Sequence, residues 1–183
     1  MKRFLIVVIL GLTIGSCKKD DGGTQTPPST TGPDFSFPAA TKFAATLYAP
    51  TLTVANGAAF DIRFVLYNVT DAFGAAAEII YSNNNVRIDS SAVGPAFSPP
   101  ASVLSLRGPA SPNTYAYGVT YIAGSNRTTT GSGVIVKLYC HAIAAGAATF
   151  TIDPAKFEVK KADGTPIANF GNMLIENVVV TIN

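Results

Sequence analysis

The chain holds one imidazole, His141, and Cys140 stands directly before it. In an extended segment neighbouring side chains point to opposite faces, so these two cannot bind one metal ion together. A zinc site needs three or four ligands. A Ser-His-Asp triad would have to use this one histidine, and the chain has no Gly-x-Ser-x-Gly turn. The sequence therefore predicts neither a metal site nor a catalytic nucleophile.

The sequence also gives no clear support for a phosphate-binding loop or for a glycosidase site. The glycines of Gly131-Ser132-Gly133 stand before a predicted strand, whereas a phosphate-binding loop opens a helix. A glycosidase needs two carboxylates about 5–10 Å apart, and the sequence does not show which of its 11 acidic residues would pair. We therefore expect no enzymatic activity and no cofactor.

Three tyrosines, Tyr115, Tyr117 and Tyr121, have the same parity in one predicted strand. If this face is exposed, the rings could stack on sugar rings. If it is buried, they line the core and each hydroxyl finds a partner. The apolar Val119, which shares their parity, favours the core.

Cys17 is the residue with the most specific chemical setting. Lys2 and Arg3 precede the mostly apolar stretch Phe4–Ile14, which is shorter than the roughly 20 residues that span a bilayer. The stretch fits a secretory signal, and Ile14-Gly15-Ser16-Cys17 resembles a bacterial lipobox. We therefore expect a lipoprotein signal peptide at 1–16 and lipid attachment at Cys17.

The residues after Cys17 predict a tether. The charged run Lys18–Gly23 resembles a surface-export signal of Bacteroidota-type lipoproteins. Thr24–Pro33 holds no large apolar residue and cannot bury enough surface to become ordered. We expect residues 17–33 to be a flexible tether that displays the protein on the outer membrane, with the lipid as its only membrane contact.

The composition beyond the tether favours an all-β domain. Hydrophobic residues make up 48% of the chain and charged residues only 13%, with a formal net charge of +2. Low charge with many Val, Ala, Thr, Gly and Pro residues suits an extracellular β-sandwich. No basic patch with interleaved aromatics is present, which argues against nucleic-acid binding.

Two alternating segments set the predicted faces. In Phe60–Tyr67, the residues Phe60, Ile62, Phe64 and Leu66 should face the core, and Asp61, Arg63 and Tyr67 should face outward. In Gly74–Tyr81, Ala76, Glu78 and Ile80 share the face opposite to Ile79. These outward positions make Asp61, Arg63, Tyr67 and Glu78 a candidate binding face.

The later part of the chain predicts more strands. In Gly131–Ile152, the residues of the two strand faces alternate up to the small residues 144–148, and the alternation resumes after them. This pattern indicates two strands joined by a tight return. Residues 92–113 contain five prolines and should be mostly loop, with an edge strand at Val103–Leu106.

These motifs resemble cohesin domains. One motif is the alternating strand Val134–Cys140, an Ala-Gly turn and Thr-Phe-Thr-Ile; the other is Phe60–Leu66, then Asn-Val, a glycine and a strand that ends in Tyr81. The resemblance covers roughly 43–182 and implies a single β-sandwich of jelly-roll topology, with about nine strands, over 34–183. Cohesins bind dockerins, calcium-loop modules on polysaccharide-degrading enzymes, through one sheet face.

The resemblance therefore predicts a non-catalytic binding module at the cell surface. Its partner would be a dockerin-like or other surface protein, in a system that degrades polysaccharide. The alternative is a carbohydrate-binding module that uses the three tyrosines.

Overall fold

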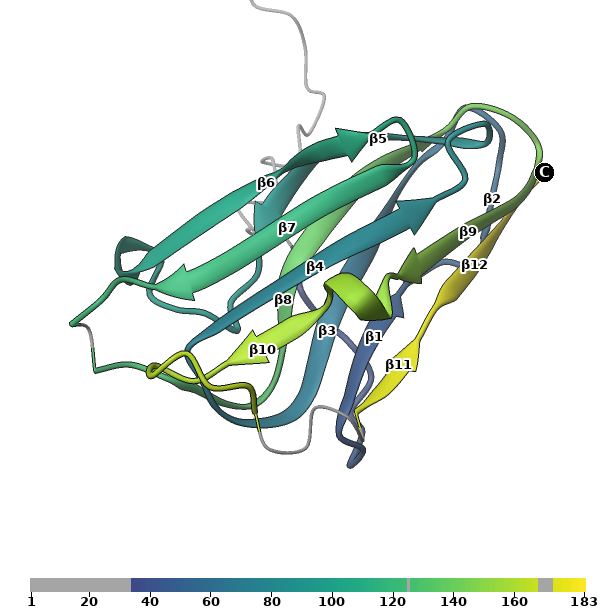
Figure 1. The fold of residues 1–183 in the computed structure, drawn as a ribbon. Helices are drawn as coiled ribbons and strands as arrows, with labels where there is room; N and C mark the ends of the chain where they lie inside the picture. Colours follow the sequence, from purple (N-terminus) through teal and green to yellow (C-terminus); the bar gives the residue numbers. More distant parts are fainter. Residues whose placement is uncertain (1–33, 125, 168–172) are drawn as a thin grey trace, which may run out of the picture. The chain divides into compact units, whose positions relative to one another are not determined.

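The computed structural model describes residues 34–124, 126–167 and 173–183, and these form a β-sandwich of two sheets (Figure 1). The predicted signal peptide, Cys17 and the tether lie outside the described residues. Among the described residues, no helix is long and apolar enough to cross a membrane.

The first sheet has five strands in the order β11-β1-β3-β8-β5. Their bounds are β1 Ala44–Tyr48, β3 Ala59–Ala72, β5 Val86–Val93, β8 Thr129–Ala142 and β11 Leu174–Glu176. The long strands β3 and β8 pair antiparallel along most of their length and form the centre of this sheet.

The second sheet has seven strands. The path runs β2-β12-β9-β4-β7-β6, and β10 pairs with β4. Their bounds are β2 Thr53–Val54, β4 Gly74–Tyr81, β6 Val103–Ser111, β7 Thr114–Tyr121, β9 Gly146–Ile152, β10 Glu158–Lys160 and β12 Val178–Ile182. Two short 3₁₀ turns, η1 Pro100–Ser102 and η2 Pro154–Lys156, precede β6 and β10.

The predicted all-β sandwich is confirmed. The described residues contain twelve strands, where about nine were expected, because β2, β10 and β11 are two- or three-residue pairings. Among the longer strands, the chain changes sheet between β3 and β4, β4 and β5, β5 and β6, β7 and β8, and β8 and β9.

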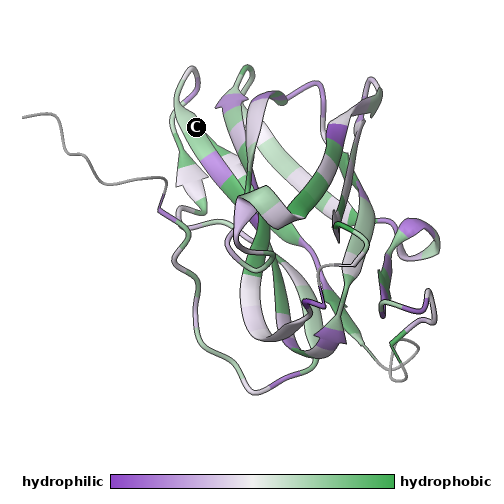
Figure 2. Cartoon of the chain, turned by 90° about the vertical axis from the view of Figure 1, so that its left-hand side faces the viewer, coloured by the Kyte–Doolittle hydropathy of each residue, from purple (hydrophilic) through white to green (hydrophobic). Residues whose placement is uncertain are grey.

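The core fills the space between the two sheets. The predicted inward residues Ile62, Phe64 and Leu66 are fully buried, and Phe60 packs against them from a half-buried position. The alternation is visible in Figure 2 as green bands separated by pale ones along the strands. Burial of each large side chain contributes about 1.5–3 kcal/mol.

A bulge in β8 interrupts the predicted alternation. Phe64 pairs with Val136 and Val65 with Val134, so Ile135 has no partner on β3. As a result Val136 belongs to the main core, whereas Val134 packs on the outer side of the sheet with Val65. The alternation predicted through Val134 was therefore wrong at that residue, because an extra residue reverses the side-chain parity.

The predicted tight return within 131–152 does not form a hairpin. β8 pairs with β3 and β5, whereas β9 pairs with β12 and β4, so the turn carries the chain from one sheet to the other. The Asn85 side chain donates to the Ala144 and Ala145 carbonyls at 3.4 and 3.0 Å and holds this turn. Gly146 leaves it with φ of 133°, a conformation that favours glycine.

The proline-rich stretch is more regular than expected. β5 extends to Val93, and β6 runs from Val103 to Ser111, five residues beyond the predicted edge strand. β6 ends the path of its sheet, so Pro109 can be accommodated there because an edge strand needs ladder donors on one side only.

Candidate functional site

The predicted binding face is covered. Asp61, Arg63 and Tyr67 do lie on the outer face of the five-stranded sheet, but Arg63 is only 2% exposed and Tyr67 only 3%. Residues 34–42, which we call the strap, lie across them. Glu78 lies on β4 in the other sheet. The prediction that these four residues form one exposed face was therefore wrong, because an irregular segment before the first strand covers part of it.

Side chains of the sheet hold the backbone of the strap. Arg63 donates to the Ser36 carbonyl and, at 3.0 Å, to the Asp34 carboxylate. Lys137 donates to the Asp34 carbonyl at 3.0 Å, and the Tyr67 hydroxyl donates to the Pro38 carbonyl at 2.8 Å. These bonds give partners both to the two buried cations and to the carbonyls of the strap.

A small second hydrophobic cluster lies beneath the strap. Val65, Tyr67, Val134 and Ala44 form its buried part, and the strap adds two half-buried phenylalanines, Phe35 and Phe37. The Phe37 ring meets the Tyr67 ring edge-on, with centroids 5.7 Å apart. The strap is thus a packed part of the domain.

The strap should loosen in acid. Hydrogen bonds from the Ser36 backbone N–H and hydroxyl, and then from Arg63, lower the pKa of Asp34 from 3.8 to about 2. Because the folded-state pKa is depressed, the carboxylate's contribution is complete above pH 3.8 and is lost as the pH falls toward 2. An NMR titration of the Ser36 amide should show a midpoint near 2 that Asp34→Asn abolishes. A midpoint near 3.8 would show that the carboxylate is not held.

The outer face of the seven-stranded sheet is open. Its residues form cross-strand rows: Leu106, Gly118, Ala76 and Glu158 in one, and Leu104, Thr120, Gly74 and Lys160 in the next. Leu104 is 56% exposed and Leu106 is 73% exposed. The floor between them and β10 is made of small residues. We call this surface the trough.

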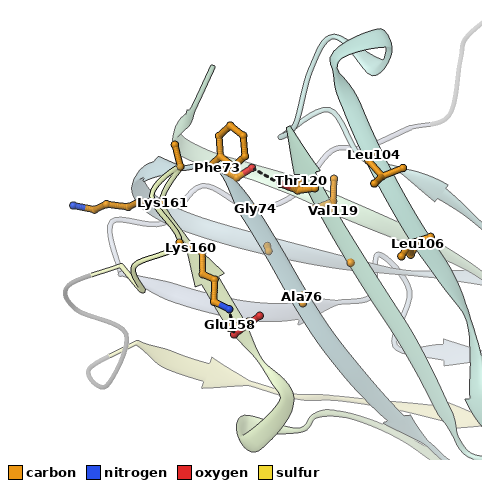
Figure 3. A pocket seen from close by; sticks show the side chains of 14 residues that line it. Phe73, Gly74, Ala76, Leu104, Leu106, Val119, Thr120, Glu158, Lys160 and Lys161 are labelled. Atoms are coloured by element: carbon orange, nitrogen blue, oxygen red, sulfur yellow. Dashed lines mark hydrogen bonds and ion pairs between the residues drawn. The ribbon is translucent and has the colours of Figure 1, made fainter. Parts of the chain in front are cut away.

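The trough is a shallow hollow with one apolar side and one charged side. Figure 3 shows the two leucines of β6 on one side and the Glu158–Lys160 ion pair of β10, 2.9 Å long, on the other. The hollow above Gly74, Ala76 and Gly118 has a volume of about 410 Å³. A second hollow of about 480 Å³ continues it over Glu78 and Gly108. Together they make an apolar surface with a charged border.

The sequence reasoning did not single out the trough. Leu104 and Leu106 stand two residues apart, which is the spacing of one strand face, but they lie in a segment predicted to be mostly loop. Ala76, Glu78 and Ile80 were placed outward, and they do have the outward parity on β4. Strand pairing that no sequence pattern shows brings β6, β7, β4 and β10 side by side.

No protein-family model and no curated protein matches the sequence, but solved structures do. A type II cohesin domain from the cellulosome of Acetivibrio cellulolyticus superposes with a TM-score of 0.66 at 8% identity, over 76% of this chain and 95% of that one. The domain has the cohesin fold. The resemblance noted in the sequence is therefore confirmed at the level of the fold.

Two further structures show the range of such neighbours. A non-cellulosomal cohesin from the hyperthermophilic archaeon Archaeoglobus fulgidus has a TM-score of 0.60 at 14% identity, over 76% of this chain and 91% of that one. A cohesin in a type I cohesin–dockerin complex from Clostridium thermocellum has a TM-score of 0.62 at 13% identity, over 76% and 99%.

The three tyrosines lie inside this cohesin-fold domain. Tyr115, Tyr117 and Tyr121 are buried, which confirms the interpretation that they line the core. Tyr117 donates to the Ile135 carbonyl at 2.5 Å, and Tyr115 shares a 2.7 Å hydrogen bond with Ser91. Burial raises the pKa of Tyr117. The proposed stacking of these rings on sugar was wrong, because the three tyrosines lie on the face of β7 that points toward the opposite sheet.

The remaining reactive groups of the cohesin-fold domain are dispersed. Cys140 is buried in the core, and burial raises the pKa of its thiol. His141 is half-buried on the next position of β8. Within 34–124, 126–167 and 173–183, no three His, Cys, Asp or Glu side chains are close enough to hold a metal ion.

Proposed function

We propose that this cohesin-fold domain is a non-catalytic docking module that binds a protein partner through the trough. The observation that carries the proposal is the pair of exposed leucines on β6 beside a floor of glycine and alanine. Apolar side chains on a flat and rigid sheet can enter a partner's pocket at little cost in conformational entropy. Burial of one such side chain against a partner contributes about 1.5–3 kcal/mol.

The charged border of the trough would fix the orientation of a bound partner. Glu158 and Lys160 lie opposite the leucines, so a partner with complementary charges on one side would bind in one orientation. Solved cohesins that share the fold were crystallised with dockerins. A dockerin-like module of an assembly that handles polysaccharide is therefore the partner we propose.

Aromatic side chains do not compete for this role. Among the described residues every Phe and Tyr is buried or half-buried, including Phe73 and Tyr117, which line the hollows. Two of the exposed large hydrophobic side chains, Leu104 and Leu106, line the trough. Sugar-binding faces need exposed rings for stacking. The trough therefore suits a protein surface better than a glycan.

Substitutions in the trough should weaken docking without unfolding the domain. Leu106→Ala should lower the affinity for a dockerin about tenfold or more, because burial of a leucine side chain contributes about 1.5–3 kcal/mol. Gly118→Val should obstruct the floor with three added carbons. The first of them, the Cβ, meets no atom of the domain within 4 Å. Binding to a panel of purified dockerin modules would be measured by biolayer interferometry.

Arg87→Ala is the matched control for these variants. Arg87 lies on β5 in the other sheet and is exposed, so its loss should leave docking unchanged. Equal binding by wild-type, Leu106→Ala and Gly118→Val proteins would show that the partner uses another surface. Failure of the whole panel to bind would contradict the dockerin-like partner.

We also propose that the domain is displayed from the outer membrane by lipid on Cys17. The strap supports this arrangement, because it fixes Asp34 over the five-stranded sheet, on the opposite layer from the trough. Cys17→Ala should abolish palmitate labelling and release the protein from membranes; unchanged fractionation would contradict the lipid anchor.

A further inference from the structure

The strap is bound in the manner of a peptide ligand. The carbonyls of residues 34, 36, 38, 40 and 42 all accept hydrogen bonds from side chains of β3 and β8. Alternate carbonyls on one side are the mark of an extended backbone. Asn68 completes the series with bonds of 3.2 Å to the Ala40 carbonyl and 2.7 Å to the Lys42 carbonyl.

The binding groups are held by the sheet itself. Asp61 lies 2.8 Å from the Arg63 Nε and 3.6 Å from the Lys137 Nζ, so both cations keep a carboxylate partner without the strap. Arg63 also lies over the Tyr48 ring at 6.0 Å, and Lys137 over the Tyr139 ring at 5.3 Å. These contacts would keep the site in shape when the strap leaves.

The strap, in contrast, depends on these side-chain bonds and on the packing of its two phenylalanine rings, because its backbone does not pair with a strand. Residues 34–41 form no strand and no ladder with the sheet. Asp34, Ser36, Pro38 and Ala39 are exposed, and Phe35 and Phe37 are only half-buried. A segment held mainly by side-chain bonds at the surface opens at a lower free energy than the strands beneath it.

We propose that the outer face of the five-stranded sheet is a peptide-binding site that accepts the strap of a second copy of this chain when its own strap is released. The ligand is an extended segment with an aspartate, two aromatic residues at alternate positions and a proline, as in Asp34-Phe35-Ser36-Phe37-Pro38. Arg63 recognises the carboxylate, and the Val65–Val134 cluster takes the rings. Exchange makes the same bonds between copies that the strap makes within one copy.

A pair of complementary variants of the full chain tests this site. The donor carries Arg63→Gln and Tyr67→Phe, which damage the site and leave the strap intact. The acceptor carries Asp34→Ala and Phe37→Ser, which damage the strap and leave the site intact. Sedimentation velocity should show a 1:1 complex in the mixture and monomers for each variant alone, since only the mixture brings an intact strap to an intact site.

A fluorescent peptide of residues 34–40 gives a second measurement that does not require the donor to fold. Its affinity for the acceptor should be at least about tenfold higher than for the wild-type protein, whose own strap competes at an effective concentration of millimolar order. A peptide with serine at both phenylalanine positions is the control and should not bind. Folded variants that form no mixed complex, or an acceptor that binds neither peptide, would overturn the proposal.

Discussion

Gly94→Ala is expected to destabilise the domain by about 3 kcal/mol or more, at the upper end of the range for overpacked sites. A Cβ at Gly94 would lie 2.1 Å from the Val134 carbonyl oxygen and 2.5 Å from its carbon. Gly94 N–H donates to the Ile135 carbonyl and Ala96 N–H to the Val134 carbonyl, both at 3.0 Å. The methyl group would push residues 94–96 away from the bulge in β8, and both hydrogen bonds to β8 would be lost.

Thermal and urea unfolding would measure the loss, which corresponds to a fall in Tm of about 10 °C for a domain of this size. Gly118→Ala is the matched control, because a Cβ there meets nothing within 4 Å. It should leave the free energy of unfolding nearly unchanged. Equal stability of the two variants would show that residues 94–96 do not pack against β8 as described.

Leu138→Ala is expected to lower the free energy of unfolding by about 2–5 kcal/mol. Leu138 is 0% exposed and lies at the centre of β8, paired with Ile62 on one side and Ser91 on the other. Truncation removes buried methyl groups and leaves a cavity that strands bonded on both sides cannot collapse to fill. The alternation of Val136, Leu138 and Cys140 places these three residues on one face of the strand, and the structure shows that this face is buried.

Leu104→Ala provides the comparison for Leu138→Ala. Leu104 is the same residue type in a strand of the same domain, but it lies in the open trough. Its truncation should change stability by less than about 0.5 kcal/mol. If both variants lost similar stability, the assignment of Leu138 to the core and Leu104 to the surface would be wrong.

Local patterns determined much of the fold. The alternation of Ile62, Phe64 and Leu66 predicts a strand with one buried face, because side chains of a strand point alternately to its two faces. Val119, which has the same parity as Tyr115 and Tyr117, correctly favoured the core for the tyrosines. Each of these inferences depends on residues within one segment.

Contacts between distant segments decided the rest. After β8 the chain could pair β9 with β8 as a hairpin or carry β9 to the other sheet. The outcome depends on which strand edges still have unpaired backbone groups. β3 and β5 occupy both sides of β8, which leaves no place there for β9. The bulge at Ile135 depends in the same way on β3 and on Gly94, residues far away in the sequence.

The two surfaces that we propose for binding show most clearly what the sequence leaves open. By itself the sequence determined that Arg63 and Tyr67 point away from the core of the sandwich, since alternation fixes the face of a strand. Only the tertiary structure decided that the strap covers them and that Leu104 and Leu106 stay uncovered. The physical reason is that exposure depends on what packs against a face, and the sequences of the segments concerned, 34–42 and 103–111, do not show which face each of them lies against.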